Sequence, residues 1–164
     1  MITISPMQAG QVAEARRLIT AVAQRIFEPG MSVEQFAAVL EREHELDDLD
    51  HYQEVYGGGR GIFLVVLDGA RLVGTGALRP LDEHTAELKR IWLLEEYHGR
   101  GLGLRLVRAL LGFARQAGYG RVVLQTSLQS ARALGFYRKL GFKEIAPYFP
   151  LPYEDDVFMA LDFF

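Results

Sequence analysis

Three glycines alternate with larger residues in the segment His98-Gly99-Arg100-Gly101-Leu102-Gly103. A predicted strand over residues 86–94 precedes the segment, and an amphipathic helix with Leu104, Val107, Leu111 and Ala114 on one face follows it. Unpaired amides at the start of a helix bind anions, and glycine lets the backbone approach a phosphate closely. The segment therefore fits a phosphate-binding turn, although a tight strand-to-helix turn without a ligand fits the glycines equally well.

Two common phosphate-binding motifs do not match this segment. A dinucleotide fingerprint needs a third glycine at the position that Leu104 occupies, and a Walker loop needs Lys followed by Ser or Thr. The segment is therefore neither a dinucleotide fingerprint nor a Walker loop.

The elements that would position this turn can be predicted from residue periodicity and turn signals. Residues 2–5 form a predicted strand, and Ser5-Pro6 begins a helix that extends to Ile26. A capping box at Ser32 begins a second helix, whereas residues 41–54, with seven acidic residues, are too acidic for a core element. Further strands are predicted at residues 62–67, 72–81, 86–94, 121–126, 142–148 and 157–163, with helices after residue 103 and at residues 130–140. This order predicts an α/β (α+β) fold with antiparallel hairpins and one strand–helix–strand crossover.

The composition sets bounds on size, location and chemistry. The 164 residues fit a single domain over residues 1–164, and 49% of them are hydrophobic, as in globular proteins. The chain has no cysteine, which excludes disulfides and an acyl-cysteine mechanism, and a net charge of −3 gives no indication of nucleic acid. With no signal peptide and no apolar run of membrane-spanning length, we expect a cytoplasmic protein without a membrane partner.

The stretch from Glu87 to Gly103 resembles the central motif of the GCN5-related N-acetyltransferases (GNAT family). That motif reads Gln/Arg-x-x-Gly-x-Gly/Ala between a strand and a helix, and its amides bind the pyrophosphate of coenzyme A. Gly101 and Gly103 match the two small positions, whereas His98 departs from the usual Gln or Arg. Because backbone amides from Arg100 to Leu104 would supply most of the contacts, we expect His98 to tune affinity only.

A second segment makes the resemblance specific. Residues 133–142, ALGFYRKLGF, resemble the family's Ala-x-x-Leu/Phe-Tyr-x-x-x-Gly-Phe segment on the helix after the next strand. The resemblance implies the GNAT fold, a mixed, mostly antiparallel, twisted sheet of six or seven strands flanked by about four helices. It also implies acetyl-CoA as co-substrate, with no metal.

The resemblance assigns two catalytic side chains. Acetylation needs a base, because an alkylammonium has a pKa of about 10, and Glu87 on the central strand is the candidate, acting through water. The alternative for Glu87 is a surface ion pair with Lys89 or Arg90. Tyr137 would protonate the departing sulfur, since a phenol with a pKa near 10 carries its proton at neutral pH. The alternative for Tyr137 is a core tyrosine.

The cofactor site implied by the resemblance includes strand, turn and helix residues. Leu93 and Leu94 would offer backbone groups to the pantetheine and the thioester oxygen, and Ser130 would contact the cofactor or cap its helix. The full set is Leu93, Leu94, His98, Gly99, Arg100, Gly101, Leu102, Gly103, Leu104, Ser130 and Tyr137.

Three weaker features surround these motifs. His44 and His51 flank the acidic segment, but their spacing fits no metal motif, so a solvated acidic loop is the better interpretation. As a rim, that segment would concentrate a cationic amine. Tyr148, Tyr153 and the prolines at 147, 150 and 152 form either a lid near the acceptor or a plain connection between strands.

The sequence favours an N-acetyltransferase that acetylates a small-molecule amine by direct attack in a ternary complex. A catalytically silent acyl-CoA-binding module and an acetyltransferase for protein N-termini or lysines stay open as alternatives. The identity of the acceptor and the oligomeric state are also open, and a homodimer is compatible with the sequence.

Overall fold

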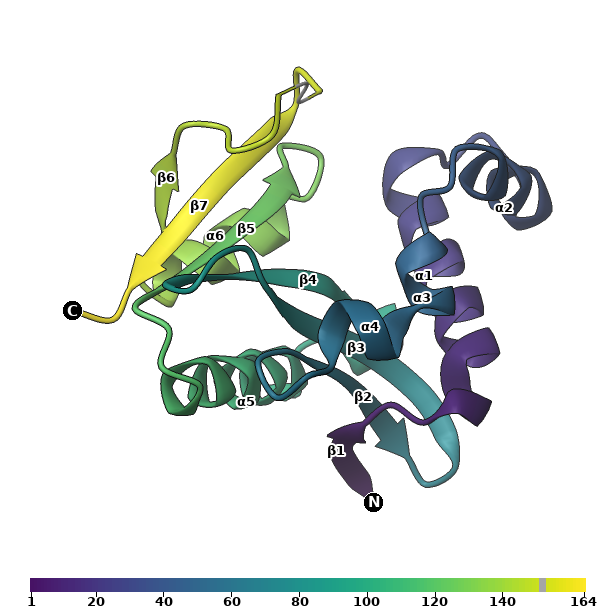
Figure 1. The fold of residues 1–164 in the computed structure, drawn as a ribbon. Helices are drawn as coiled ribbons and strands as arrows, with labels where there is room; N and C mark the ends of the chain where they lie inside the picture. The colour runs from purple at the N-terminus through teal and green to yellow at the C-terminus, as the bar shows by residue number, and fades with distance from the viewer. Residues whose placement is uncertain (151–152) are drawn as a thin grey trace.

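One mixed sheet runs through the chain in the order β1-β2-β3-β4-β5-β7-β6 (Figure 1). The computed structural model describes residues 1–150 and 153–164, so Pro152 of the predicted lid lies outside the described residues. The strands are β1 (Ile2–Pro6), β2 (Ile62–Asp68), β3 (Arg71–Pro80), β4 (Thr85–Leu93), β5 (Arg121–Ser127), β6 (Lys143–Ile145) and β7 (Asp156–Asp162). Neighbouring strands are antiparallel except β4 and β5, which are parallel. The predicted mixed, mostly antiparallel sheet is confirmed.

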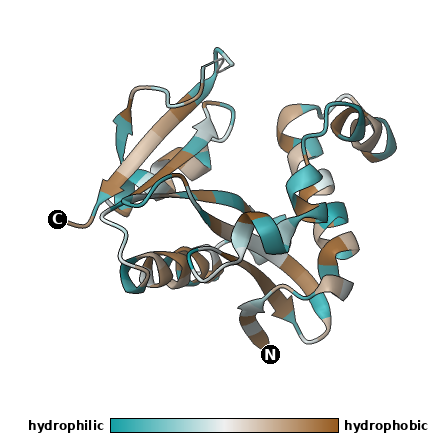
Figure 2. Cartoon of the chain, in the orientation of Figure 1, coloured by the Kyte–Doolittle hydropathy of each residue, from teal (hydrophilic) through white to brown (hydrophobic). Residues whose placement is uncertain are grey.

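Helices cover both faces of the sheet. They are α1 (Val12–Phe27), α2 (Val33–Arg42), α3 (Asp47–Asp50), α4 (Tyr52–Tyr56), α5 (Leu102–Gln116) and α6 (Ala131–Lys139), with 3-10 turns η1 (Ala9–Gln11) and η2 (Glu95–Tyr97). One buried cluster joins the sheet to α5 and α6, and a second joins its other face to α1, α3 and α4. Hydrophobic residues accordingly concentrate on the strands and on one side of α5 (Figure 2). Within the described residues, no helix has the length and apolar character needed to cross a membrane.

The starts of the two N-terminal helices compare differently with the sequence prediction. The predicted capping box of α2 is present: the Gln35 N–H donates to Ser32 Oγ at 3.1 Å, and Gln35 Oε1 accepts from the Ser32 N–H at 2.9 Å. The predicted start of α1 at Ser5-Pro6 is wrong, because Pro6 stays in β1 opposite Leu64. A 3-10 turn follows instead, and α1 begins at Val12.

The acidic segment at residues 41–54 contributes to the core, contrary to the sequence expectation. Its charged residues other than Asp48 are exposed, while Leu46 and Leu49, together with Tyr56 just after the segment, are buried against α1 and the sheet. The short helices α3 and α4 place these apolar side chains on one side. They add to the four longer helices that were expected.

The sheet opens between its two halves. The β4–β5 ladder extends only from Thr85–Arg121 to Leu88–Leu124, so the rest of β4 has no partner strand on that side among the described residues. In Figure 1 the half with β5, β6 and β7 diverges from the half with β1 to β4. The glycine turn after β4 and helix α6 after β5 lie at the open end of this split.

Candidate active site

Six consecutive backbone N–H groups are free at the start of α5. The N–H groups of residues 99–104 donate to no acceptor among the described residues, since the first bond of this helix runs from Arg105 to the Gly101 carbonyl at 3.1 Å. Gly99 and Gly101 have φ values of 78° and 74°, which only glycine adopts without strain. Alternating left- and right-handed residues of this kind turn successive N–H groups toward a common anion. The geometry of the turn is therefore compatible with an anion such as a phosphate.

Strand β4 contains a bulge just before this turn. Ala77 of β3 pairs with Lys89 and Thr75 pairs with Trp92, so β4 has one extra residue opposite Gly76. Arg90 takes up the extra length with a φ of 59°, unusual for a residue with a side chain. The Thr75 hydroxyl donates to the Arg90 carbonyl at 2.7 Å, which holds the bulge in place.

A buried cluster from the acidic segment fixes the Arg90 side chain. Its Nε and an Nη donate to the two oxygens of Asp48 at 3.0 and 2.7 Å, and the same Nη reaches the Glu45 carbonyl at 2.7 Å. Tyr56 donates to Asp48 at 2.5 Å. Burial raises the pKa of Asp48, but the hydrogen bonds and charge of Arg90 outweigh it and hold this pKa below 3.8. Helices α3 and α4 thus anchor the bulge.

The backbone N–H groups of Leu93 and Leu94, both predicted to contact the cofactor, point to opposite sides of β4. The Leu94 N–H donates to the Val73 carbonyl of β3 at 3.0 Å, so it is not free for a thioester oxygen. Leu93 precedes it in the strand, and its backbone groups point to the opposite side, toward the gap before β5. The prediction for the Leu94 amide is therefore wrong, and the geometry leaves Leu93 as the candidate.

His98 links the turn to both sides of the gap. Its Nδ1 faces Arg132 Nη at 2.9 Å and its Nε2 faces the Leu93 carbonyl at 3.1 Å. Because the guanidinium can only donate, Nδ1 accepts, and the ring proton on Nε2 donates to Leu93. His98, which departs from the family pattern, therefore links β4 to α6 through these two contacts. No sequence signal identified Arg132 as its partner.

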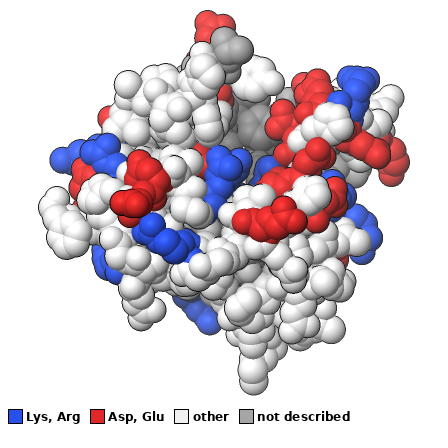
Figure 3. Space-filling model, in the orientation of Figure 1, with Lys and Arg blue, Asp and Glu red and all other residues white. Residues whose placement is uncertain are grey.

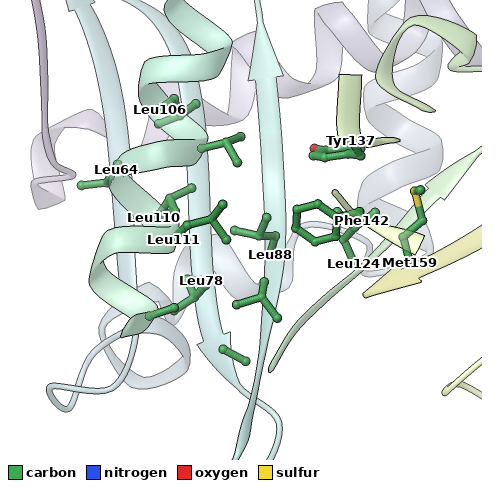
Figure 4. Close-up of a cluster of buried hydrophobic side chains, with 14 of the residues drawn as sticks. Leu64, Leu78, Leu88, Leu106, Leu110, Leu111, Leu124, Tyr137, Phe142 and Met159 are labelled. Carbon is green, nitrogen blue, oxygen red and sulfur yellow. The ribbon is translucent and has the colours of Figure 1, made fainter. Parts of the chain in front are cut away.

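Tyr137 is a buried tyrosine without a hydrogen-bond partner. Its side chain is 6% exposed and packs edge-to-face with Phe136 and Phe142 at centroid distances of 5.3 and 5.6 Å. Its hydroxyl bonds to no described residue, yet no fully enclosed polar side-chain atom of those residues lacks a partner, so the hydroxyl is reachable from outside. Burial raises the phenol pKa, which keeps it protonated. Figure 4 shows the hydroxyl directed toward β4.

Ser130 lies at the N-cap position, immediately before α6. Its hydroxyl makes no capping bond, and its N–H donates to the Ser127 carbonyl at 2.9 Å. The capping interpretation is therefore not supported, and contact with the cofactor stays a prediction.

Glu87 is buried, not a surface residue. It is 1% exposed; Arg79 Nε donates to Oε1 and the Tyr148 hydroxyl donates to Oε2, both at 2.7 Å. The expected alternative, an ion pair with Lys89 or Arg90, is wrong because Arg79 lies directly opposite Glu87 on β3. Burial and then the charge of Glu87 raise the pKa of Tyr148, so it stays protonated. Tyr148 thus ties the 146–150 segment to the central strand.

The two histidines of the acidic segment form no metal site with their neighbours. Among residues 1–150 and 153–164, no three His, Asp or Glu side chains come close enough to share an ion. His44 Nδ1 instead contacts Asp47 Oδ2 at 3.0 Å in an exposed pair.

Comparisons with known proteins agree with this geometry. The chain is 30% identical over 132 residues to an uncharacterized N-acetyltransferase of Schizosaccharomyces pombe, covering 79% of the chain and 81% of that protein. It is 40% identical over 87 residues to human N-acetyltransferase 8B. This match covers 50% of the chain and only 38% of the human protein. Among solved structures, the PaiA N-acetyltransferase of Thermoplasma acidophilum, in complex with coenzyme A, superposes with a TM-score of 0.78 at 19% identity over 99% of both chains. A model of the Acetyltransferase (GNAT) family matches residues 28–142, and the chain belongs to that family.

Proposed function

We propose that the protein transfers an acetyl group from acetyl-CoA to a primary amine by direct attack in a ternary complex. The observation that carries this proposal is the run of six free N–H groups from Gly99 to Leu104, between a bulged strand and a helix N-terminus. These groups fit the pyrophosphate of coenzyme A, and the solved PaiA structure of the same fold contains coenzyme A. Acetyl-CoA supplies the activated acetyl thioester.

The chain supplies an amide for the carbonyl oxygen of that thioester. The Leu93 N–H faces the unpaired side of β4, and an amide fixed in a strand donates to developing negative charge without reorganising. One such donor contributes about 3–4 kcal/mol to a transition state. His98 holds the Leu93 carbonyl, which belongs to the next peptide unit, and so restrains the backbone of Leu93.

Glu87 receives the proton of the acceptor amine, and Tyr148 carries it there. Both oxygens of Glu87 are engaged, one by Arg79 and one by Tyr148. The Tyr148 oxygen takes a proton from the amine while its own proton moves to Oε2, so the phenol ends unchanged. Direct contact between Glu87 and the amine is not needed.

Tyr137 protonates the departing sulfur. Its hydroxyl has a proton, no partner among the described residues, and a direction toward β4. The absence of cysteine from the chain leaves no thiol to carry the acetyl group, which supports direct attack.

Release of coenzyme A with acetyl-CoA and a panel of amines tests this proposal. We expect turnover with at least one small amine. Acetyl-CoA binding without turnover on small amines or peptides would support the silent module, and turnover on peptides alone would support the protein acetyltransferase.

The phosphate turn has its own test by calorimetry. Gly101→Glu places bulk, strain and negative charge among the free N–H groups, and acetyl-CoA binding should fall at least about 100-fold. Ala109→Glu adds the same charge on the exposed side of the same helix and should leave affinity unchanged. Unchanged affinity in Gly101→Glu would rule out this turn as the cofactor site.

A further inference from the structure

Charged side chains gather on the face of β3 and β4 opposite α5. Leu78 and Leu88 point toward α5, so their neighbours Arg79, Glu87 and Lys89 point to the other face. Ala77, directly opposite Lys89, is buried there against the helices of the acidic segment. A charged patch on this face of β3 and β4 therefore consists of Arg79, Glu87 and Lys89. We call this patch the β4 floor.

One positive charge of this region has no counter-ion. Arg79 pairs with Glu87 and Arg90 pairs with Asp48. No carboxylate of the described residues lies within 4.0 Å of the Lys89 ammonium, although the residue is half-buried. Burial and then the charge of Arg90 lower the pKa of Lys89, and the more distant charges of Glu87 and Asp48 do not fully offset them.

The Lys89 ammonium is nevertheless accessible. No fully enclosed polar side-chain atom of the described residues is unpartnered, so this nitrogen reaches solvent. Lys89 precedes Leu93 by four residues, but the bulge shortens this stretch to the three β3 steps from Ala77 to Gly74, about 10 Å. A lysine side chain and a small bound molecule span that length together.

Acidic side chains lie beside the unpaired cation of the β4 floor. Figure 3 shows Lys and Arg side chains near the centre of the view, with Asp and Glu side chains over the region of α2 to α4. Exposed Glu41, Glu43, Glu45 and Asp47 belong to that acidic rim. The rim attracts an ammonium group, whereas the floor offers an unpaired cation to an anion.

We propose that Lys89 binds an anionic group of the acceptor, so that the acceptor is an amine that also carries a carboxylate or a phosphate. The inference rests on the proposed acetyltransferase function and names the substrate class of the same site. Lys89 is a specificity residue: it holds the acceptor, while Leu93, Glu87 and Tyr137 act on the reacting atoms.

Matched acceptors test this inference. The pairs are glycine and glycinamide, phenylalanine and phenylalaninamide, and O-phosphoethanolamine and ethanolamine, each measured as kcat/KM with acetyl-CoA. We expect the anionic member of at least one pair to be preferred by about 10-fold or more, because a hydrogen bond to a charged group has that strength. The carboxylate and phosphate pairs show which anion the site takes.

Variants at Lys89 assign the preference to its charge. Lys89→Met should remove the preference by lowering kcat/KM for the anionic acceptor alone, and Lys89→Arg should retain it. Lys143→Met, an exposed change on β6, is the control and should behave as wild type. If Lys89→Met fails to bind acetyl-CoA, Lys89→Gln provides the same comparison.

The outcomes separate this inference from the proposed function. Turnover without a preference for anions, or a preference that survives in Lys89→Met, overturns the role of Lys89 and leaves the acetyltransferase intact. No turnover on any amine, with acetyl-CoA still bound, overturns both.

Discussion

The buried tyrosines of this protein differ in what their hydroxyls do. Tyr56 donates to Asp48, Tyr97 to Asp68 and Tyr119 to the Arg60 carbonyl, all at 2.5–2.7 Å. Tyr137 alone among the buried tyrosines donates to no described residue. A buried phenol usually finds a partner when burial is its only role, so the unpartnered hydroxyl of Tyr137 fits the proposed donor to a bound molecule.

Replacing two of these tyrosines separates catalysis from stability. Tyr137→Phe should lower kcat about 100-fold or more, the usual contribution of a general acid, and change acetyl-CoA affinity and stability little. Tyr119→Phe should cost about 1 kcal/mol of stability, the worth of its hydrogen bond, and leave kcat unchanged. Single-turnover kinetics, calorimetry and urea unfolding measure these effects. Equal losses of kcat and acetyl-CoA affinity in Tyr137→Phe would count against an acid role.

At the scale of elements, two links hold the unpaired part of β4 beside the opening to β5. The Arg90 cluster anchors the bulge to α3 and α4, and His98 connects the end of β4 with α6. Both links join segments far apart in the sequence, by 42 residues for Arg90–Asp48 and by 34 for His98–Arg132.

The variant Arg90→Gly tests the link between the bulge and helices α3 and α4. Arg90→Gly keeps the positive φ without strain but leaves Asp48 without its ion pair, so the free energy of unfolding should fall by about 3 kcal/mol, and kcat should fall because the bulge loses its anchor. Arg71→Ala removes an exposed ion pair with Glu96 and should change the free energy of unfolding and kcat little. Full turnover in a folded Arg90→Gly protein would show that the anchor is dispensable.

A double-mutant cycle tests the second link. His98→Phe and Arg132→Met each break this link, so their effects on acetyl-CoA affinity should be non-additive, with a coupling of at least about 0.5 kcal/mol. Additive effects, measured by calorimetry on both single variants and the double variant, would mean that the two side chains act separately.

Local sequence patterns predicted the parts of the site that are local in the chain. The glycine turn and the Tyr137 segment are short motifs, and strand and helix periodicity placed them in the sheet and on α6. Arg79, Tyr148 and Asp48 were missed as partners, because their contacts depend on register and on packing across as many as 61 residues. The buried apolar side of the acidic segment was missed because charge count outweighed the spacing of Leu46, Leu49 and Tyr56.

At the scale of the whole molecule, Asp48 connects the acidic segment to the response to acid. Its folded pKa lies below the ordinary value of 3.8, although burial alone would raise it. A carboxyl with a depressed folded pKa stabilises the fold above its unfolded pKa, and that stability is lost as the pH falls through the folded pKa. Acid should therefore release α3 and α4 from the bulge.

The stability of Asp48→Asn as a function of pH tests this link. Between pH 7 and about pH 5 the variant should be less stable than wild type by a constant amount, because Asn cannot pair with the Arg90 charge. Below about pH 5 the difference should shrink, since wild type then loses the stabilisation that the variant never had. Urea unfolding from pH 7 to pH 3 measures both curves, with Asp162→Asn, in an exposed pair with Arg121, as the control of small effect. A difference that stayed constant below pH 5 would assign the acid response to other carboxyls and leave Asp48 only its bond to the bulge.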